Sequence, residues 1–531
     1  MKTYCVIVFA ACIGFAQSTP PKSGQKDACT PPPSGVPPSL PARLMTGQGR
    51  VHFPITTSNP KAQEFFDQGV AQLHSFWATE AERSFLQAAE LDPEAPMPYW
   101  GIAMVAAGDY RPRFQLDNYD KVFGKGNPLK AGARAIAAAK KADELAEVPG
   151  KASDLEKMYV AAIVARRLPD ANHPDVNHAE EAYVRALRAI VATHPDEIEA
   201  RTYLALHLMR GFELPDKKPR GTSMEAVEIL RDLLNRAPDH PGVHHYVIHG
   251  FEGSRFAKDA WPSCQRYSEL VTNIPHALHM PGHIYSQTGR WDDAVRSFEA
   301  AAENERGYIK ADSLYGFGHH GHNVHYLATA YSFEGQYDKA KSAARELLAL
   351  KENPREQANL DGFFSGYRQG WFAMLRTLVQ SESWDEILDG TTLPAYAKPR
   401  EEAWRHWAMA LAHIGKGERE LAKQESGLMD ASLLDYKEKV KMPIPEPLKV
   451  ARVELDGQLQ VAAGKLGRGM HKLRDAARLE LEMVYSEPPY YPRPVSEALG
   501  EIAMQHRRPA DAQAAFRIAL DQYPNSYKAQ K

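Results

Sequence analysis

From about residue 60 onward, apolar residues recur at the spacing of helices. Stretches of 12 to 16 residues, with apolar side chains at steps of three and four, are separated by short turns rich in Gly and Pro. Segments such as 132–146 and 180–192 are also rich in alanine, a strong helix former. The strict alternation of apolar and polar residues that marks a half-buried β-strand does not appear. The pattern therefore predicts an all-α fold.

The helical stretches repeat one another. Ala81, Phe85 and Ala88 follow Gly69 by 12, 16 and 19 positions. Apolar residues follow Gly282 at the same three intervals, and they follow Ala328 at these intervals as well. Short turn motifs, GRW at 289–291 and GQY at 335–337, separate the two helices of a unit. A recurring unit of two helices predicts an array of stacked hairpins rather than a plain helical bundle.

These offsets and turns resemble the tetratricopeptide repeat, a 34-residue helix-turn-helix unit. The resemblance covers most of residues 60–525, with degenerate units around 110–170 and 350–400. It implies an all-α, right-handed superhelix whose A helices line a concave face and whose B helices form the convex face. The motifs HYVIH, HMPGHIY and HNVHYL also resemble a widespread, largely uncharacterised family of histidine-rich tetratricopeptide-repeat proteins, which implies a fold but no settled activity.

The N-terminus is typical of an exported protein. Residues 1–18 combine one lysine, an apolar stretch and a small-x-small triplet, as in a secretory signal peptide. Residues 19–50 are rich in Pro, Ser and Gly, which predicts a disordered linker. We therefore expect a secreted, extracellular or periplasmic protein. Its repeats divide into an N-terminal block (51–235), a histidine-rich block (236–350) and a C-terminal block (351–531).

Composition narrows the classes of function. The net charge of -3 offers no basic field for nucleic acid, so we expect no nucleic-acid partner. Beyond the signal, no apolar run approaches the roughly 20 residues that span a bilayer. Removal of the signal leaves only Cys29 and Cys264, which do not form a disulfide framework. Motifs for phosphate loops, serine-hydrolase elbows and thiol chemistry are missing.

Histidines recur at equivalent positions of three consecutive repeats. When Gly282 is taken as position 8 of helix A, positions 2, 5, 9 and 12 lie on one face of the helix. Displacements of 34 and 46 residues relate the neighbouring repeats, the second including a 12-residue insertion. Position 12 of the first repeat is Glu252. The histidines on this face are His245, His249, His276, His279, His283, His322 and His325.

We interpret these seven histidines as candidate metal ligands. Seven neutral imidazoles in one patch would need many buried hydrogen-bond partners, and their protonation would bring like charges together. A metal ion removes both costs, and helix axes about 8–10 Å apart let imidazoles of neighbouring helices converge. The alternative is that each is a hydrogen-bonded core residue copied by repeat duplication. Because proline disrupts helices, Pro281 predicts that its helix begins there or bends.

Ligand chemistry suggests which metal and which reaction. Imidazole-dominated ligation favours copper, zinc, iron or nickel over magnesium or calcium. Two His-x3-His pairs with histidines from a third helix resemble, in ligand type only, a binuclear copper site of the tyrosinase kind. Together with export, this favours a copper enzyme that oxidises a small molecule or peptide in the concave groove, with Glu252 as candidate general base, ligand or supporting carboxylate. Zinc-dependent hydrolysis, an iron site and a non-enzymatic peptide-binding scaffold are the alternatives.

Other residues in the sequence have no assigned role. His52, His240, His244, His319 and His320 do not match across repeats. Near the ends of the array, Trp100, Tyr490 and Tyr491 are candidates for closing the groove over a small molecule. The substrate, the number of ions and the oligomeric state do not follow from the sequence.

Overall fold

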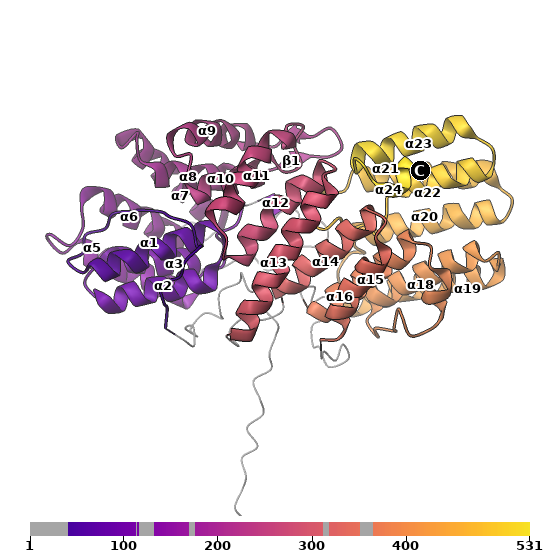
Figure 1. Cartoon of the computed structure of the whole chain (residues 1–531), viewed down its shortest axis with the longest axis horizontal. Coiled ribbons are helices and arrows are strands. Elements are labelled where there is room, and N and C mark those ends of the chain that lie inside the picture. The colour runs from indigo at the N-terminus through magenta and orange to yellow at the C-terminus, as the bar shows by residue number, and fades with distance from the viewer. Residues whose placement is uncertain (1–40, 113, 116–131, 169–175, 312–317, 351–364) are drawn as a thin grey trace, which may run out of the picture.

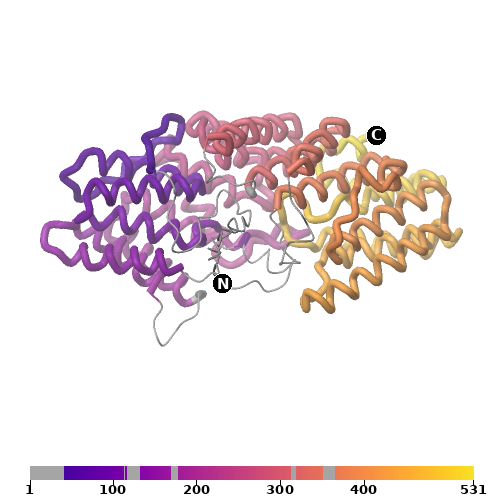
Figure 2. The backbone as a smooth tube through the Cα atoms, turned by 90° about the horizontal axis from the view of Figure 1, so that it is seen from below, coloured from indigo at the N-terminus to yellow at the C-terminus, as the bar shows by residue number. Residues whose placement is uncertain are grey.

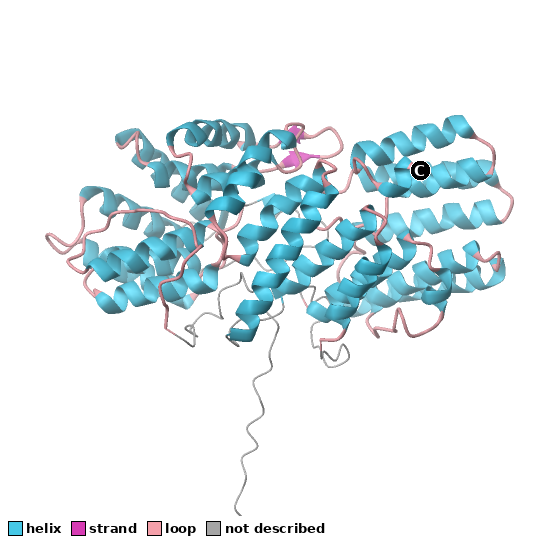
Figure 3. Cartoon of the chain, in the orientation of Figure 1, coloured by secondary structure: helices cyan, strands magenta, loops and turns pink. Residues whose placement is uncertain are grey.

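The computed structural model describes residues 41–531 except 113, 116–131, 169–175, 312–317 and 351–364. The expected signal and most of the expected linker lie outside the described residues. Within the described part the fold is helical, and the only strands are two antiparallel pieces of two residues each, β1 (Phe212–Glu213) and β2 (Lys218–Pro219) (Figure 3). The all-α prediction is confirmed. None of the described helices is apolar over a length that would cross a bilayer.

In chain order the helices are α1 (Pro60–His74), α2 (Ala78–Leu91), α3 (Pro96–Val105), α5 (Ala133–Ala146), α6 (Asp154–Arg167), α7 (Val176–Thr193), α8 (Ile198–Leu208), α9 (Ser223–Arg236), α10 (Pro241–Phe251), the 3-10 helix η1 (Ala257–Ala260), α11 (Trp261–Leu270), α12 (Pro275–Gln287), α13 (Trp291–Ala311), α14 (Gly318–Phe333), α15 (Tyr337–Leu348), α16 (Gly366–Gln380), α17 (Trp384–Leu388), α18 (Pro399–Gly415), α19 (Arg419–Val440), α20 (Glu446–Ala462), α21 (Leu466–Leu481), α22 (Val495–Gln505), α23 (Pro509–Gln522) and α24 (Tyr527–Gln530).

Consecutive helices pair as hairpins, and the hairpins stack on one another. The helices of each pair α1/α2, α12/α13, α14/α15, α18/α19 and α20/α21 pack closely against each other. Figure 1 shows these hairpins following one another along the long axis of the molecule. Seen from below, the chain follows an arch, with the α12–α15 segment between its N-terminal and C-terminal parts (Figure 2). The molecule is therefore a superhelix of tetratricopeptide-type units, as the repeating offsets predict.

The recurring interval of 16 residues has a packing cause. A Cβ on Gly69 would lie 2.6 Å from the ring of Phe85, and a Cβ on Gly282 would lie 2.4 Å from the ring of Phe298. Each glycine therefore lets the aromatic ring of helix B lie directly against the backbone of helix A. In the turn between the helices, Gly289 adopts a φ of 78°, a left-handed conformation that favours glycine.

Two clusters of buried apolar side chains form the core, and the histidine-rich helices lie where the clusters meet. The first cluster extends along the chain from Phe53 to Ile284, and the second begins at Trp291. Tyr285 packs against both clusters. Helix α12 thus contributes buried side chains to the first cluster and α14 to the second, and Tyr285 of α12 joins the two.

Both chain ends pack against the middle of the array. Near the N-terminus, the backbone N–H groups of Thr272 and Asn273 donate to the Gly47 carbonyl over 3.0 and 2.9 Å, so this end of the expected linker is held in place. At the other end, Trp291 Nε1 donates to the Pro524 carbonyl over 2.8 Å. The C-terminal repeats therefore return to the turn that follows α12.

For the helix that contains Pro281, the sequence predicts either a start or a bend at that proline, and α12 excludes the start. It begins at Pro275, where a proline is tolerated, and it continues through Pro281 to Gln287. It therefore does not begin at Pro281, and it carries His276, His279 and His283 on a single helix.

Candidate metal centre

Three consecutive A helices hold the seven histidines. Helix α10 carries His245 and His249, α12 carries three and α14 carries the remaining two. All are buried except His322, which is partly buried. Six of them fall into two groups that we call the first histidine triad (His245, His249 and His276) and the second histidine triad (His279, His283 and His322).

In the first triad, three imidazole nitrogens converge on one point. One ring nitrogen from each of its members lies within 4.8 Å of the other two. The Nε2 atoms of His245, His249 and His276 are buried and have no hydrogen-bond partner among the described residues. Burial first, and then a neighbouring histidine, lower the pKa of His245 and of His276 far below 6.5. These two rings are therefore neutral, the protonation state in which imidazole binds metals.

Hydrogen bonds on the opposite side of the rings set the tautomers. His245 Nδ1 donates to the backbone carbonyl of His74, the last residue of α1, over 2.5 Å. His249 Nδ1 donates to Glu252 Oε2 over 3.1 Å. Because a carbonyl and a carboxylate only accept, the proton of each ring lies on Nδ1 and the Nε2 atom keeps its lone pair.

His276 reaches the same tautomer through a second histidine. His319 Nδ1 donates to Glu305 Oε1 over 2.9 Å, so His319 Nε2 is an acceptor. That nitrogen accepts from His276 Nδ1 over 3.1 Å, which leaves the lone pair of His276 on Nε2. All three Nε2 atoms of the first triad are therefore oriented as metal ligands, each held by an acceptor behind it.

In the second triad, ring nitrogens face one another at short range. His279 Nε2 lies 2.6 Å from His283 Nε2 and 3.2 Å from His322 Nε2. His279 Nδ1 donates to Asn323 Oδ1 over 2.6 Å, and the amide of Asn323 is oriented by its own bond to the Phe298 carbonyl. His279 Nε2 is therefore an unprotonated nitrogen that needs a proton or a cation in front of it.

His283 is held by two carboxylates. Its Nδ1 atom lies 2.9 Å from Glu252 Oε1 and 2.6 Å from Glu487 Oε2. Burial lowers the pKa of His283, but Glu487 and Glu252 outweigh it and raise the pKa to about 9. His283 is therefore protonated and its Nε2 proton bridges to His279, and a metal ion bound here would have to displace that proton.

One carboxylate connects the two triads. Glu252 accepts through Oε2 from His249 in the first triad and through Oε1 from His283 in the second. The ring centroids of these two histidines lie 6.5 Å apart, and those of His276 and His279 lie 6.2 Å apart. Burial raises the pKa of Glu252, but both histidines oppose this and lower it to about 2, so the carboxylate is ionised.

Glu487 was not recognised from the sequence. It lies in the loop between α21 and α22, more than 200 positions after His283, and the only signal was the motif SEPPYYPRP around it. The buried guanidinium of Arg376 on α16 anchors this loop by donating to the carbonyls of Tyr491 and Pro492 over 2.9 and 3.2 Å.

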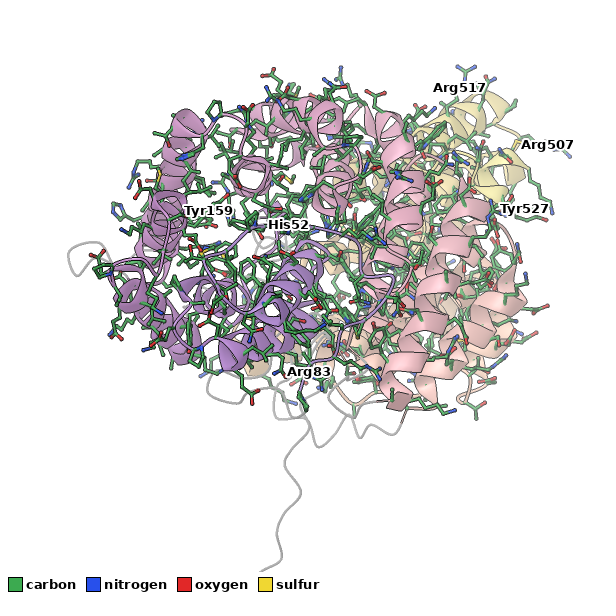
Figure 4. The ribbon with its side chains drawn as sticks, turned by 60° about the vertical axis from the view of Figure 1, so that its left-hand side comes forward. His52, Arg83, Tyr159, Arg507, Arg517 and Tyr527 are labelled. Atoms are coloured by element: carbon green, nitrogen blue, oxygen red, sulfur yellow. The ribbon has the colours of Figure 1, made fainter. Side chains whose placement is uncertain are left out.

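His325 lies outside both triads. Its Nδ1 atom donates to Gln369 Oε1 over 2.6 Å, and its ring packs near Phe372. The other histidines that lacked an assignment have polar partners. His52 is on the surface beside Asp67, on the loop that precedes α1 (Figure 4). The remaining partners are Glu199 for His240, Ser263 and the Pro238 carbonyl for His244, and Glu346 for His320.

A cavity of about 210 Å³ opens beside the triads. Phe372, Trp404, Tyr485 and Tyr490 contribute aromatic wall, and Glu487 contributes a carboxylate. Tyr490 thus lines this cavity, whereas Trp100 and Tyr491 are buried in the core. The histidines that line it are His249, His276, His283, His319, His322 and His325.

Comparisons with known proteins assign neither a family nor a function to the chain. No family model matches the chain, and no curated protein matches it. Among solved structures, it is similar to the human IFIT1 dimer with m7Gppp-AAAA (12% identity over 89% of this chain and 91% of that chain, TM-score 0.35). It is also similar to yeast Tom70 (12%, 89% and 87%, TM-score 0.29) and to the APC/C hetero-tetramer Cut9–Hcn1 (11%, 89% and 89%, TM-score 0.28). These low scores carry no inference about its activity.

Proposed function

We propose that the protein binds two metal ions, one on each histidine triad, and that copper bound there oxidises a small molecule in the adjoining cavity. The observation that carries the proposal is that one ring nitrogen from each of His245, His249 and His276 lies within 4.8 Å of the other two, while all three Nε2 atoms are buried without a hydrogen-bond partner among the described residues. Desolvated acceptors without partners are costly in a folded protein, and a shared cation satisfies all three at once.

The donor set supports copper as the preferred ion. Six imidazoles and no thiolate suit copper or zinc rather than magnesium or calcium, which prefer oxygen ligands. The expected export of the protein also favours these metals over ferrous iron. When bound, a pair of copper ions would supply two-electron redox chemistry, with dioxygen as the terminal oxidant that takes up the electrons lost by the substrate. The chain contributes the ligand tautomers, the exclusion of water from the triads and the cavity that orients a substrate.

The proposed role of Glu252 changes from general base to positioning residue. Its two oxygens face the Nδ1 atoms of ligands, and its side chain is not among those that line the cavity. A carboxylate in this place orients the imidazoles and strengthens them as ligands. Glu487, which does line the cavity, holds the same nitrogen of His283.

Two alternatives follow from the same site. With zinc on one or both triads, the chain would be a hydrolase. Without any metal, the cavity would bind a peptide or small ligand and the protein would be a scaffold. Unlike common peptide-binding tetratricopeptide repeats, positions 5 and 9 carry histidine instead of lysine and asparagine.

Elemental analysis of the purified protein after exhaustive dialysis tests the proposal. We expect two copper ions per chain, and we expect His249→Ala and His283→Ala each to reduce bound metal sharply while helical circular dichroism is preserved. The control is His194→Ala, which lies outside the triads and contacts Thr193. Zinc near one per chain would support the hydrolase instead. Full metal content in both triad variants, or a protein that stays metal-free when copper is supplied, would defeat the proposal.

A further inference from the structure

His325 is the one histidine of the repeating pattern that neither triad uses. It is 3% exposed and lines the cavity. Its Nδ1–H donates to the side-chain oxygen of Gln369, so the lone pair of the ring lies on Nε2. This Nε2 atom is buried and has no hydrogen-bond partner among the described residues. A ligand that carries a hydrogen-bond donor would satisfy this acceptor.

The ring stays neutral over the physiological range. Burial first, and then the guanidinium of Arg376, lower the pKa of His325 to about 3. His325 is three positions from His322, and its ring packs near Phe372. His325 therefore lines the cavity outside both triads and carries an acceptor that no described residue uses.

The wall next to His325 is aromatic. The ring centroids of His325 and Phe372 lie 5.9 Å apart, and those of Phe372 and Trp404 lie 5.5 Å apart. Both aromatic residues line the cavity, together with Pro447 and Leu448. Phe372 and Trp404 thus give the lining next to the unpaired acceptor of His325 an apolar surface, which fits a planar ring that carries a hydrogen-bond donor. Charged side chains also line the cavity: Arg111, Arg368, Arg400, Glu401 and Glu487. The volume of about 210 Å³ is large enough for a single ring.

We propose that the substrate is a single-ring phenol and that His325 binds it by accepting a hydrogen bond from the ring hydroxyl, with the ring against Phe372 and Trp404. This inference rests on the proposed function for the oxidation of the phenol, whereas the binding of the phenol by His325 does not depend on it. A ligand without the O–H group leaves His325 Nε2 unpaired, so the cavity discriminates against it.

The test compares phenol with anisole, in which a methyl ether replaces the hydroxyl. Binding is measured by calorimetry on the full chain loaded with Zn²⁺, which does not oxidise either compound. We expect phenol to bind about tenfold more tightly than anisole, the effect of one hydrogen bond to a buried acceptor. In His325→Ala the ratio should fall to about one, and His325→Gln, which restores an acceptor, should recover part of it. His413→Ala, a surface histidine paired with Glu418, should keep the full ratio.

The outcomes separate this inference from the proposed function. Metal content and circular dichroism are measured on every variant, and a wild-type chain that binds no ion overturns the proposed function. The phenol-to-anisole ratio is then measured on the metal-free chain and still tests His325. Equal affinities of the wild-type protein for the two compounds, or an unchanged ratio in His325→Ala, overturn the role of His325 alone.

Discussion

A buried imidazole becomes a metal ligand only when its proton is held on the other nitrogen. In the first triad this is done by a backbone carbonyl, a carboxylate and a second histidine, which act on His245, His249 and His276 respectively. In the second triad, Asn323 and a pair of carboxylates do the same. Glu252 takes part in both, so one side chain orients a ligand of each proposed ion.

Glu252→Gln should therefore weaken both metal sites. A glutamine side chain offers one oxygen and one N–H group, and that N–H would face an Nδ1–H of either His249 or His283. Losses of this kind typically cost about 10–100-fold in metal affinity. We expect that loss in competition titrations against a chelator, with little change in circular dichroism.

Glu482→Gln is the control for the same substitution, because Glu482 pairs with Arg478 at the surface. Full affinity for both ions together with loss of oxidation in Glu252→Gln would restore the role of Glu252 as general base.

The shifted pKa of a second residue, Glu480 on α21, makes the stability of the protein depend on pH. Burial raises its pKa to about 8, although the Val495 N–H and Gln522 oppose the shift. Between about pH 4.5 and 8 the folded protein therefore keeps a proton that the unfolded chain loses, and stability falls as pH rises through this window. Glu480→Gln removes the dependence.

We therefore expect the melting temperature of Glu480→Gln, relative to wild type, to increase between pH 5 and pH 8. The free-energy change is on the order of a few kcal/mol. A difference in melting temperature that does not vary with pH would show that Glu480 is ionised in the folded protein.

At the scale of elements, the position of α12 against α13 determines where three of the six proposed ligands lie. The contact depends on Gly282, whose missing side chain makes room for the ring of Phe298. His279 lies on the same surface, with its ring centroid 4.9 Å from that of Phe298. A change in the spacing of this hairpin therefore displaces the second triad.

Gly282→Ala should destabilise the protein and weaken metal binding together. The added Cβ would lie 2.4 Å from Phe298, so the helices must separate, at a cost of about 1–3 kcal/mol. The matched control is Gly307→Ala in α13, where an added Cβ meets no atom within 4 Å. This control should raise stability by roughly 0.5–1 kcal/mol, because alanine is the better helix former. Thermal unfolding measures both, and a neutral Gly282→Ala would contradict the packing.

At the scale of the whole molecule, the proposed centre draws on segments far apart in the sequence. The carbonyl behind His245 belongs to His74, and one carboxylate behind His283 belongs to Glu487. Ions bound between the repeats would thus stabilise contacts that reach across much of the chain. An ion that binds only the folded state stabilises it by about 2.7 kcal/mol at a hundred times its dissociation constant.

Removal of metal should therefore lower the melting temperature by a few degrees, and addition of copper should restore it. Differential scanning calorimetry of the chelated and reloaded protein measures the shift. The double variant His249→Ala/His283→Ala should show no response to copper. An identical melting temperature with and without bound metal would show that the ions do not connect the repeats.

The sequence by itself determined the repeat fold and the set of candidate histidines. The interval between Gly282 and Phe298 recurs between Gly69 and Phe85 because one glycine must face one ring in both hairpins, and helical periodicity places residues at steps of three and four on one face. Both are local properties, so they can be read along the chain. The division into two triads, the separate place of His325, the position of Glu252 behind the ligands and the participation of Glu487 were decided only by the tertiary structure. Those features depend on the curvature of the superhelix and on the return of its C-terminal repeats, which bring together residues that no local pattern relates.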